Sequence, residues 1–267
     1  MEILGKVFVV TGGGNGIGRE VVLNLLSKGG KVAAVDLSEE RLAETVRLAG
    51  TNAPHLTTHV VNVTDKAAVR GLPDAVVEAH GAVDGLLNVA GIIQRFVPFA
   101  DLAEEDIERV LNVNFWGVVN MLKAFLPHLL ARPKAAIVNV SSMGAFIPVP
   151  GQTIYGASKA AVKLLTEGLH AELRGSNVRV TVVFPGGVAT SITENSGVSA
   201  PAVAGADAGK MKLTQPHEAA QVIVTAMEKG SYRATIGQDA RMMDWATRLV
   251  PERAMTMIAD QMASLAH

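Results

Sequence analysis

Tyr155 and Lys159 are four residues apart in a stretch, Thr153 to Leu173, whose apolar residues repeat with helical periodicity. Side chains at this spacing project from one face of a helix. A phenol is a poor base at neutral pH because its pKa is about 10, but a nearby ammonium favours phenolate and lowers that pKa by about one to three units. The pair can therefore exchange a proton, although a tyrosine and a lysine at this spacing also occur by chance on many helices.

The segment Thr11 to Gly18, with the sequence TGGGNGIG, follows a β-branched run and opens a helical pattern. Glycines at such a junction let the backbone turn tightly and approach a pyrophosphate, whose charge then meets backbone amides at the helix N-terminus. Ordinary turns also collect glycine, so the motif depends on its context. The expected cofactor contacts in this loop are Gly12, Gly14, Asn15, Gly16, Ile17 and Gly18.

Asp36, followed by Leu37, ends the second strand-like run and is the next expected cofactor contact. A carboxylate about 20 residues beyond the glycines accepts hydrogen bonds from an adenosine ribose. A 2′-phosphate would bring like charges together, and no arginine or lysine occupies Gly13, Gly14 or Asn15 to compensate. The pattern favours NAD over NADP, and the alternative is a surface aspartate that merely ends a strand.

These residues need a scaffold, and short β-branched runs alternating with longer helical patterns predict one. Runs that are apolar on both faces are typical of a parallel sheet with helices on both sides, joined by right-handed crossovers. We therefore expect an α/β, single-domain, Rossmann-like doubly wound parallel sheet, whose ligands lie outside the carboxyl ends of the strands. The predicted strands are Val7 to Val10, Val32 to Val35, His59 to Val63, Val83 to Val89, Ala135 to Val140 and Val178 to Phe184.

The composition fits a soluble globular protein and excludes several functions. Hydrophobic residues make up 49% of the 267 residues, and 24 Lys and Arg balance 25 Asp and Glu without a basic block, which argues against nucleic-acid binding. The absence of cysteine excludes disulfides, thiolate zinc sites and cysteine nucleophiles, and the seven histidines show no metal-ligand spacing. With no secretion signal and no run of roughly 20 apolar residues, we expect a cytoplasmic protein without a membrane span.

We expect one domain over residues 1–267, with two additions to the sheet. Residues 191–215 are rich in Ser, Gly, Ala and Thr and follow a strand end, which favours a substrate lid over a disordered insertion. Residues 239–267 form a helical extension in which Met255, Ile258, Met262 and Leu265 repeat at helical spacing. This apolar face can cover a lipid-like substrate, touch a membrane surface or pack against another subunit, and subunit packing is the safest of the three.

Taken in order, the motifs resemble those of the short-chain dehydrogenase/reductase family. The segment Thr11 to Gly18 matches the family's TGxxxGxG, and Tyr155 to Lys159 matches its YxxxK. Asn88-Val89-Ala90-Gly91 resembles its NNAG, and Pro185 to Thr190 matches its PGxxxT. The resemblance runs from about residue 6 to 190 with every motif in order, and more loosely to about residue 237.

The resemblance implies roles for four catalytic residues, Asn114, Ser142, Tyr155 and Lys159. Ser142, thirteen residues before the tyrosine, would hydrogen-bond the substrate oxygen while Tyr155 moves the proton. Lys159 would lower the pKa of the tyrosine and bind the nicotinamide ribose. Asn114 matches the family's helix-kinking asparagine, which holds a water that links the lysine to solvent. Ser141 is the rival serine, and strand alternation sends the two serines to opposite faces.

The same resemblance extends the expected cofactor contacts along the chain. Asn62 stands where the family often has aspartate, and an asparagine can still accept from and donate to adenine. Val89 replaces the second asparagine of NNAG. Tyr155 and Lys159 would also touch the cofactor. The further expected contacts are Asn62, Val63, Asn88, Ala90, Gly91, Pro185, Gly186, Val188 and Thr190.

The substrate side is expected to be mostly apolar. The predicted walls are residues 93–99 and 143–151, Gly187 and the lid, with core packing as the alternative for each. Gln94 and Arg95 could recognise a polar end of the substrate. The named apolar members are Phe96, Phe99, Met143, Phe146, Ile147 and Val149.

The sequence thus predicts an NAD-dependent oxidoreductase that interconverts a hydrophobic secondary alcohol and a ketone. A NADP-dependent carbonyl reductase, a non-catalytic NAD-binding sensor or scaffold, and an epimerase or dehydratase that keeps its NAD remain alternatives. Family members are usually dimers or tetramers built on the helices that bear Asn114 and Tyr155, so the resemblance implies a homo-oligomer, with a homotetramer as our specific expectation. The substrate, the preferred direction and the stereochemistry are not encoded in these motifs.

Overall fold

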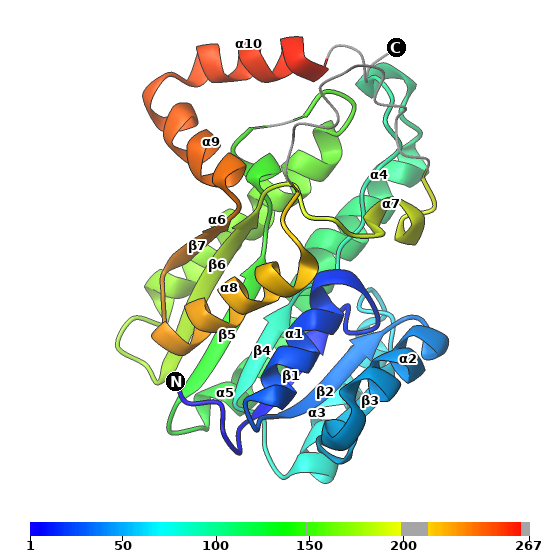
Figure 1. The fold of residues 1–267 in the computed structure, drawn as a ribbon, viewed down its shortest axis with the longest axis vertical. Coiled ribbons are helices and arrows are strands. Elements are labelled where there is room, and N and C mark those ends of the chain that lie inside the picture. The colour runs from blue at the N-terminus through cyan, green and yellow to red at the C-terminus, as the bar shows by residue number, and fades with distance from the viewer. Residues whose placement is uncertain (148, 199–212, 263–267) are drawn as a thin grey trace.

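A seven-stranded parallel sheet forms the centre of the computed structural model, which describes residues 1–147, 149–198 and 213–262 (Figure 1). The strand order is β3-β2-β1-β4-β5-β6-β7, and every neighbouring pair is parallel. The order reverses between β1 and β4, so the predicted doubly wound fold is confirmed. The strands are β1 (Val7–Thr11), β2 (Lys31–Asp36), β3 (Leu56–Val60), β4 (Gly85–Asn88), β5 (Ala135–Val140), β6 (Val178–Pro185) and β7 (Arg233–Ile236).

The inner strands begin and end near the predicted residues, whereas the two edges differ. Strand β3 starts and ends three residues before the prediction of 59–63, because Leu56 pairs with Val32 and the register ends where Val60 faces Asp36. Its side chains are partly exposed, so it lacks the two-sided apolar pattern of a buried strand. Strand β7 was not predicted, since its four residues are mostly half-buried and too short to show a periodicity.

Helices cover both faces of the sheet in two layers (Figure 1). One layer buries α1, α2 and α8 against side chains such as Val10 and Val183, and the other buries α3, α5 and α6 against side chains such as Val9 and Ile137. Both layers pack on a mostly aliphatic sheet, in which Phe8 and Phe184 are the large aromatic exceptions, and this fits the aliphatic, aromatic-poor composition. The bounds of these helices are α1 Gly16–Ser27, α2 Glu39–Ala49, α3 Lys66–His80, α5 Gly117–Leu130, α6 Thr153–Glu172 and α8 Pro216–Lys229.

The remaining helices are short or peripheral. Helix α4 (Glu104–Leu111) runs through one turn of π-helix at Asn112–Trp116 into α5. Short 3-10 turns occupy Gly50–His55, Phe99–Asp101 and Met143–Ala145. Of the predicted lid, the structure describes residues 191–198, with helix α7 (Ile192–Asn195), and residues 213–215, while 199–212 lie outside the described residues. Within the described part of the chain, no helix is both long and apolar enough to cross a bilayer.

The predicted C-terminal extension consists of α9 (Gln238–Leu249) and α10 (Pro251–Met262), which lie beyond the carboxyl end of β7 in Figure 1. Ala254 and Ile258 of α10 pack with Ile147 and Met243 in a small third cluster. Of the predicted apolar face, Ile258 is buried in this cluster, whereas Met255 is 38% exposed. Leu265 lies outside the described residues.

Candidate active site

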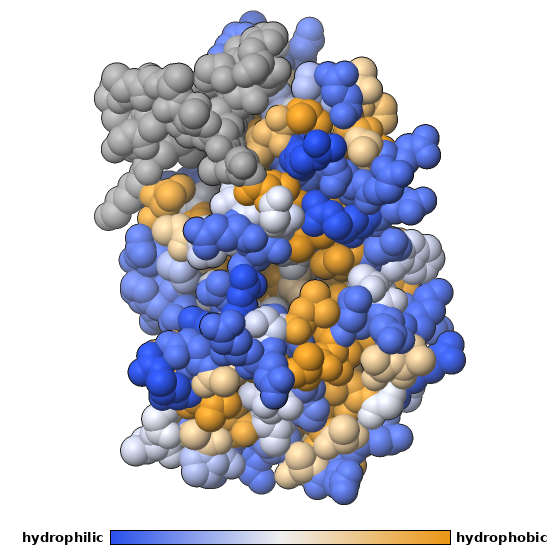
Figure 2. Space-filling model, turned by 90° about the vertical axis from the view of Figure 1, so that its right-hand side faces the viewer, coloured by the Kyte–Doolittle hydropathy of each residue, from blue (hydrophilic) through white to orange (hydrophobic). Residues whose placement is uncertain are grey.

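A cleft opens where β1, β2 and β4 end, at the point where the strand order reverses. In Figure 2, which views the molecule from the side of α2 and α4, hydrophobic residues gather around a hollow near the middle of the face. The cleft brings together segments that are about 180 residues apart, as the motif order predicts. The expected cofactor residues that line it are Gly12, Asn15, Gly16, Ile17, Gly18, Asp36, Leu37, Asn62, Val63, Ala90, Gly91 and Thr190.

The glycine loop fits a bound dinucleotide because it leaves no room for side chains. A Cβ on Gly12 would lie 3.1 Å from the backbone of Ala90, and a Cβ on Gly18 would lie 2.1 Å from the carbonyl oxygen of Gly12. Gly16 begins α1 at a φ of +52°, and the side chain of Asn15 caps that helix by accepting from the Gly16 N–H. Open backbone N–H groups at a helix N-terminus suit a pyrophosphate.

Asp36 is oriented toward the cleft by two backbone hydrogen bonds. The N–H of Gly14 donates to one carboxylate oxygen at 3.0 Å, and the N–H of Ser38 donates to the other at 3.1 Å. Each carboxylate oxygen keeps a lone pair for a ribose hydroxyl. Arg41, which the sequence reasoning overlooked, lines the same cleft from the first turns of α2. The sequence feature that could have identified Arg41 is its position in a helical stretch five residues after Asp36.

Several expected cofactor residues lie behind the cleft rather than in its wall. Gly14 binds Asp36 through its backbone, and Asn88 is buried and donates to Asn139 on the neighbouring strand at 2.8 Å. After Pro185 ends β6, the N–H of Gly187 donates to the Asp239 carboxylate at 2.7 Å. A Cβ on Gly186 would lie 2.2 Å from that carboxylate.

Val188 continues this turn and pairs with Thr214 in an isolated parallel bridge. Asp239, at the start of α9, therefore holds the PGxxxT turn from a position the sequence reasoning did not single out. The bridge is a second support, because it joins the turn to the last residues of the predicted lid.

Ser141 and Ser142 point in opposite directions, as strand alternation predicts. The Ser141 hydroxyl donates to the Lys159 carbonyl on α6 at 2.7 Å, so it belongs to the helix-packing side. The Ser142 hydroxyl accepts from the Gly144 N–H at 3.0 Å. A Cβ on Gly144 would lie 3.4 Å from the Ser142 hydroxyl and 3.5 Å from the Tyr155 ring, so serine and tyrosine flank this glycine.

Tyr155 and Lys159 lie on one face of α6, with the lysine Nζ 5.9 Å from the centre of the tyrosine ring. Burial raises the pKa of the Tyr155 phenol, and the Ser142 side chain partly offsets this shift by lowering that pKa. The direction is opposite to the expected effect of Lys159, because desolvation is the largest influence on the phenol. Burial also lowers the pKa of Lys159, to about 8, so the lysine is still mostly charged at neutral pH.

Asn114 lies at the centre of the π-helical turn and is fully buried. Its side-chain oxygen accepts from the Ile92 N–H at 2.9 Å, and its amide donates to the Ile92 carbonyl at 2.9 Å and to Ser158 at 3.0 Å. A Cβ on Gly91 would meet both Lys159 Nζ, at 3.0 Å, and the Asn114 side-chain oxygen, at 3.3 Å. The π-helical turn therefore places the asparagine beside the lysine.

The expected substrate walls are only partly available to a ligand. Ile147 is fully buried in the third cluster, and Phe99 is 59% exposed. Arg95 pairs with Asp106 on α4 at 2.7 Å. Gln94 is fully buried and hydrogen-bonds the chain itself, so it is not available to recognise substrate, whereas the Arg95 side chain is 52% exposed.

Comparison with known proteins agrees with this geometry. The family model described as short chain dehydrogenase matches residues 6–199. A Mycobacterium tuberculosis protein named as an oxidoreductase, SadH, is 39% identical over 262 residues, covering 96% of this chain and 94% of its own. A protein named 3-oxoacyl-[acyl-carrier-protein] reductase FabG from Thermotoga maritima is 36% identical over 233 residues, covering 87% of this chain and 94% of its own.

Two solved structures are similar over nearly the whole chain. A short chain dehydrogenase/reductase from Burkholderia phymatum in complex with NAD has a TM-score of 0.83 at 28% identity, covering 96% of each chain. A short chain dehydrogenase from Burkholderia cenocepacia in complex with NADP has a TM-score of 0.81 at 26% identity, covering 97% of this chain and 99% of its own. Both nicotinamide cofactors thus occur among the structural relatives.

Proposed function

Since the chain belongs to the short-chain dehydrogenase/reductase family of oxidoreductases, we propose that it moves hydride between NAD and a secondary alcohol or ketone, with Tyr155 as proton carrier. The observation that carries the proposal is the meeting of Ser142, Tyr155 and Lys159 beside a cleft lined by the glycine loop. NAD would supply the hydride acceptor, and the protein groups around it would position the alcohol and manage its proton.

Ser142 and Tyr155 act on the substrate oxygen. In alcohol oxidation the tyrosine accepts the hydroxyl proton, and in ketone reduction it returns a proton to the oxygen as charge develops there. The Ser142 hydroxyl donates a hydrogen bond to the same oxygen and stabilises that charge. Because burial raises the pKa of Tyr155, alcohol oxidation requires either alkaline pH or a nearby positive charge to favour the phenolate.

Lys159 serves the cofactor and the proton. Its Nζ donates to the Val140 carbonyl at 3.1 Å, and an ammonium carries three donors, so donors remain for the ribose hydroxyls. With a pKa of about 8, Lys159 can release and regain a proton near neutral pH. Asn114, next to it, is suited to holding the water through which that proton reaches solvent.

The preference for NAD rests on Asp36, whose carboxylate faces the adenosine end of the cleft and disfavours a 2′-phosphate. Arg41 lines the same region and favours the second candidate, a NADP-dependent carbonyl reductase. The two side chains act in opposite directions. We expect Asp36 to dominate because two backbone N–H groups fix its carboxylate in place.

The experiment is an absorbance assay at the reduced-nicotinamide band, with the purified protein offered NAD or NADP and a panel of secondary alcohols. The panel extends from short chains to sterols and hydroxyacyl compounds. Reduction of NAD with one chemical class supports the proposal, and faster reduction of NADP supports the second candidate. Tight NAD binding without net reduction points instead to an epimerase, a dehydratase or a sensor.

Tyr155→Phe is the matching variant, and we expect it to lower turnover by at least about a hundredfold while NAD still binds, because it removes only the proton carrier. The chain has two tyrosines, and Tyr232→Phe is the control. Tyr232 lies before β7 and is 43% exposed, so its variant should keep full turnover. Normal turnover by Tyr155→Phe would exclude the assigned role.

A further inference from the structure

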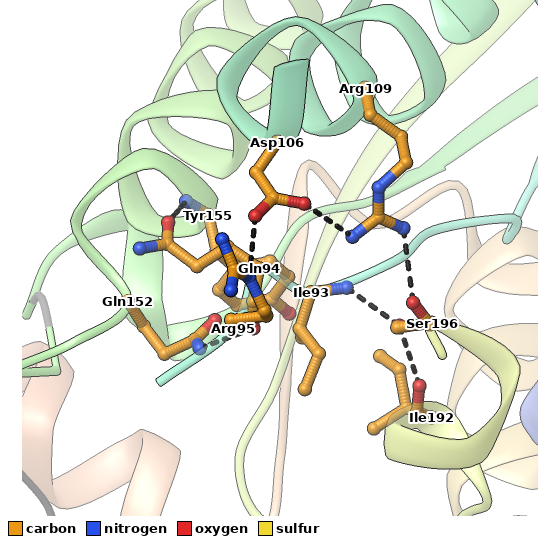
Figure 3. Close-up of polar contacts among 9 residues, drawn as sticks. All are labelled: Ile93, Gln94, Arg95, Asp106, Arg109, Gln152, Tyr155, Ile192 and Ser196. Carbon is orange, nitrogen blue, oxygen red and sulfur yellow. Dashed lines mark hydrogen bonds and ion pairs between the residues drawn. The ribbon is translucent and has the colours of Figure 1, made fainter. Parts of the chain in front are cut away.

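Gln94 connects the chain after β4 to the first turn of the helix that carries Tyr155. Its side-chain oxygen accepts from the N–H of Ile154 at 2.8 Å and from the N–H of Tyr155 at 3.0 Å. Its amide donates to the Gly151 carbonyl at 2.9 Å. The side chain is fully buried, so one residue makes three hydrogen bonds away from water. Figure 3 shows the one that joins it to Tyr155.

Helix α6 needs this contact because its own cap residue does not provide one. The first N–H groups of a helix have no partner within the helix, and a side chain at the cap position usually accepts from one of them. At α6 that position is Gln152, which makes no capping hydrogen bond. The amide of Gln152 donates instead to the Gln94 carbonyl at 2.8 Å. Gln94 thus supplies the cap from 60 positions away in the chain.

The segment that carries Gln94 is also the wall of the cofactor cleft. Ala90, Gly91 and Ile92 line the cleft directly before it, and Ile92 is held on both its N–H and its carbonyl by Asn114. The reacting geometry in hydride transfer depends on the distance between the nicotinamide site and the tyrosine phenol. Gln94 binds the backbone of Tyr155 itself, so it links these two parts directly.

We propose that Gln94 is a positioning residue, which fixes Tyr155 relative to the cofactor by capping α6 from the cleft wall. The proposal rests on the proposed function for its kinetic consequence, but the contact itself can be tested without a substrate. Misplacement of a reacting group by about 1 Å lowers a rate by about a hundredfold. Loss of this cap therefore lowers the catalytic rate by an amount that the free energy of unfolding does not reveal.

The test uses the protein labelled with fluorotyrosine. Because the chain has two tyrosines, its fluorine NMR spectrum holds two resonances, which Tyr232→Phe assigns. Gln94→Met removes the acceptor while keeping the length of the side chain. We expect it to shift or broaden the Tyr155 resonance and to leave that of Tyr232 unchanged. In Gln94→Glu the carboxylate still accepts from both N–H groups and suits a helix N-terminus, although it loses the donor to the Gly151 carbonyl, so the Tyr155 resonance should change less than in Gln94→Met.

A matched control separates positioning from stability. Asn177 directly precedes β6 and so lies at the opposite end of the sheet. Its side-chain amide also donates to two backbone carbonyls, those of Leu129 and Arg132. Asn177→Leu should destabilise the fold and leave the Tyr155 resonance in place. If Gln94→Met leaves that resonance unchanged, or if Asn177→Leu changes it equally, the proposal is wrong.

Kinetics complete the test once a substrate is known. We expect Gln94→Met to lower kcat by about 10-fold to 100-fold with little change in the affinity for NAD. Gln94→Glu should recover most of the kcat, with its pH profile moved to higher pH because a carboxylate disfavours the phenolate. A wild-type protein that oxidises no alcohol would refute the proposed function, whereas the fluorine spectra would still decide the role of Gln94.

Discussion

Lys159 is a buried charge that the fold tolerates at a cost. Its side chain is only 4% exposed, and burial lowers its pKa from 10.5 to about 8. At about 1.4 kcal/mol per pKa unit, this difference corresponds to an electrostatic cost of about 3 kcal/mol while the lysine is charged in the folded protein. Ionisable groups whose pKa is strongly shifted by burial, at a cost to stability, are typical of active sites.

We predict that Lys159→Met abolishes turnover and raises the free energy of unfolding by about 1–3 kcal/mol at neutral pH, because it removes a desolvated charge and leaves only the Val140 carbonyl without its donor. Between pH 8 and 10.5 the unfolded chain binds the lysine proton and the folded protein does not. Wild-type stability should therefore rise with pH across that window, and the advantage of the variant should shrink.

Urea unfolding at pH 7 and above pH 10 measures both effects. Lys163→Met is the control, since Lys163 lies one turn later on α6 and is paired with Glu167 near the surface. Its change should be small at either pH. A Lys159→Met variant that is no more stable than the wild type would show that the lysine is not held at an electrostatic cost.

For individual residues, spacing and motif order were sufficient to predict the reacting side chains but not the residues that hold them in place. The resemblance to the family's motifs pointed to Ser142, Tyr155 and Lys159, and the structure brings them together. Gln94 and Asp239 hold backbone atoms that are about 50 to 60 positions away in the chain. A contact at that separation has no periodicity to reveal it, so the sequence pattern left Gln94 between a substrate contact and core packing.

At the scale of elements, α7 is tied to the rest of the site by the residues around Gln94 (Figure 3). The Ile93 N–H donates to the Ser196 hydroxyl at 2.9 Å, just after α7 ends. Arg109 on α4 donates to the Ser196 carbonyl at 3.1 Å and is itself paired with Asp106. Ile192 of α7 lines the cofactor cleft, so this network holds one wall of the cleft in place.

We predict that Arg109→Ala speeds release of the reduced cofactor by about 2-fold to 10-fold, the equivalent of one lost hydrogen bond, because α7 is then held by fewer contacts. Stopped-flow measurement of nicotinamide fluorescence reports the release rate directly. Arg47→Ala is the control, since Arg47 also binds a carboxylate, that of Glu44, on α2. Equal release rates for both variants would mean that Arg109 does not restrain α7.

The elements that the sequence misplaced are those whose position depends on neighbours. Strand β3 is an edge strand, and its register is set by pairing with β2 rather than by its own apolar residues. Strand β7 gains its place from pairing with β6 and from the packing of α8 beside it. The inner strands, by contrast, carry continuous buried side chains, and their own composition specified them.

In the molecule as a whole, two separate exposed apolar surfaces are candidates for a subunit interface. Leu164 on α6 is 69% exposed, and Trp116 at the start of α5 is 47% exposed. At the C-terminal end, Trp245 is 63% exposed and Leu249 is 72% exposed, both on α9. Exposed large apolar side chains of this kind often mark interfaces. The family's usual assembly, through the helices that bear Asn114 and Tyr155, favours the first surface.

We predict that the protein forms a homo-oligomer through α5 and α6 and that Leu164→Glu dissociates it, because a carboxylate placed in an apolar interface must lose its water. Leu249→Glu is the matched control, since it puts the same charge on an equally exposed leucine of α9 and should leave the assembly intact. Size-exclusion chromatography with light scattering measures the mass of each variant. Dissociation by Leu249→Glu alone would place the interface on the C-terminal helices, and a monomeric wild type would contradict the prediction.

Because α6 also carries Tyr155, an interface there would further immobilise the reacting helix. The dissociated Leu164→Glu variant should therefore also have a lower turnover than the wild type.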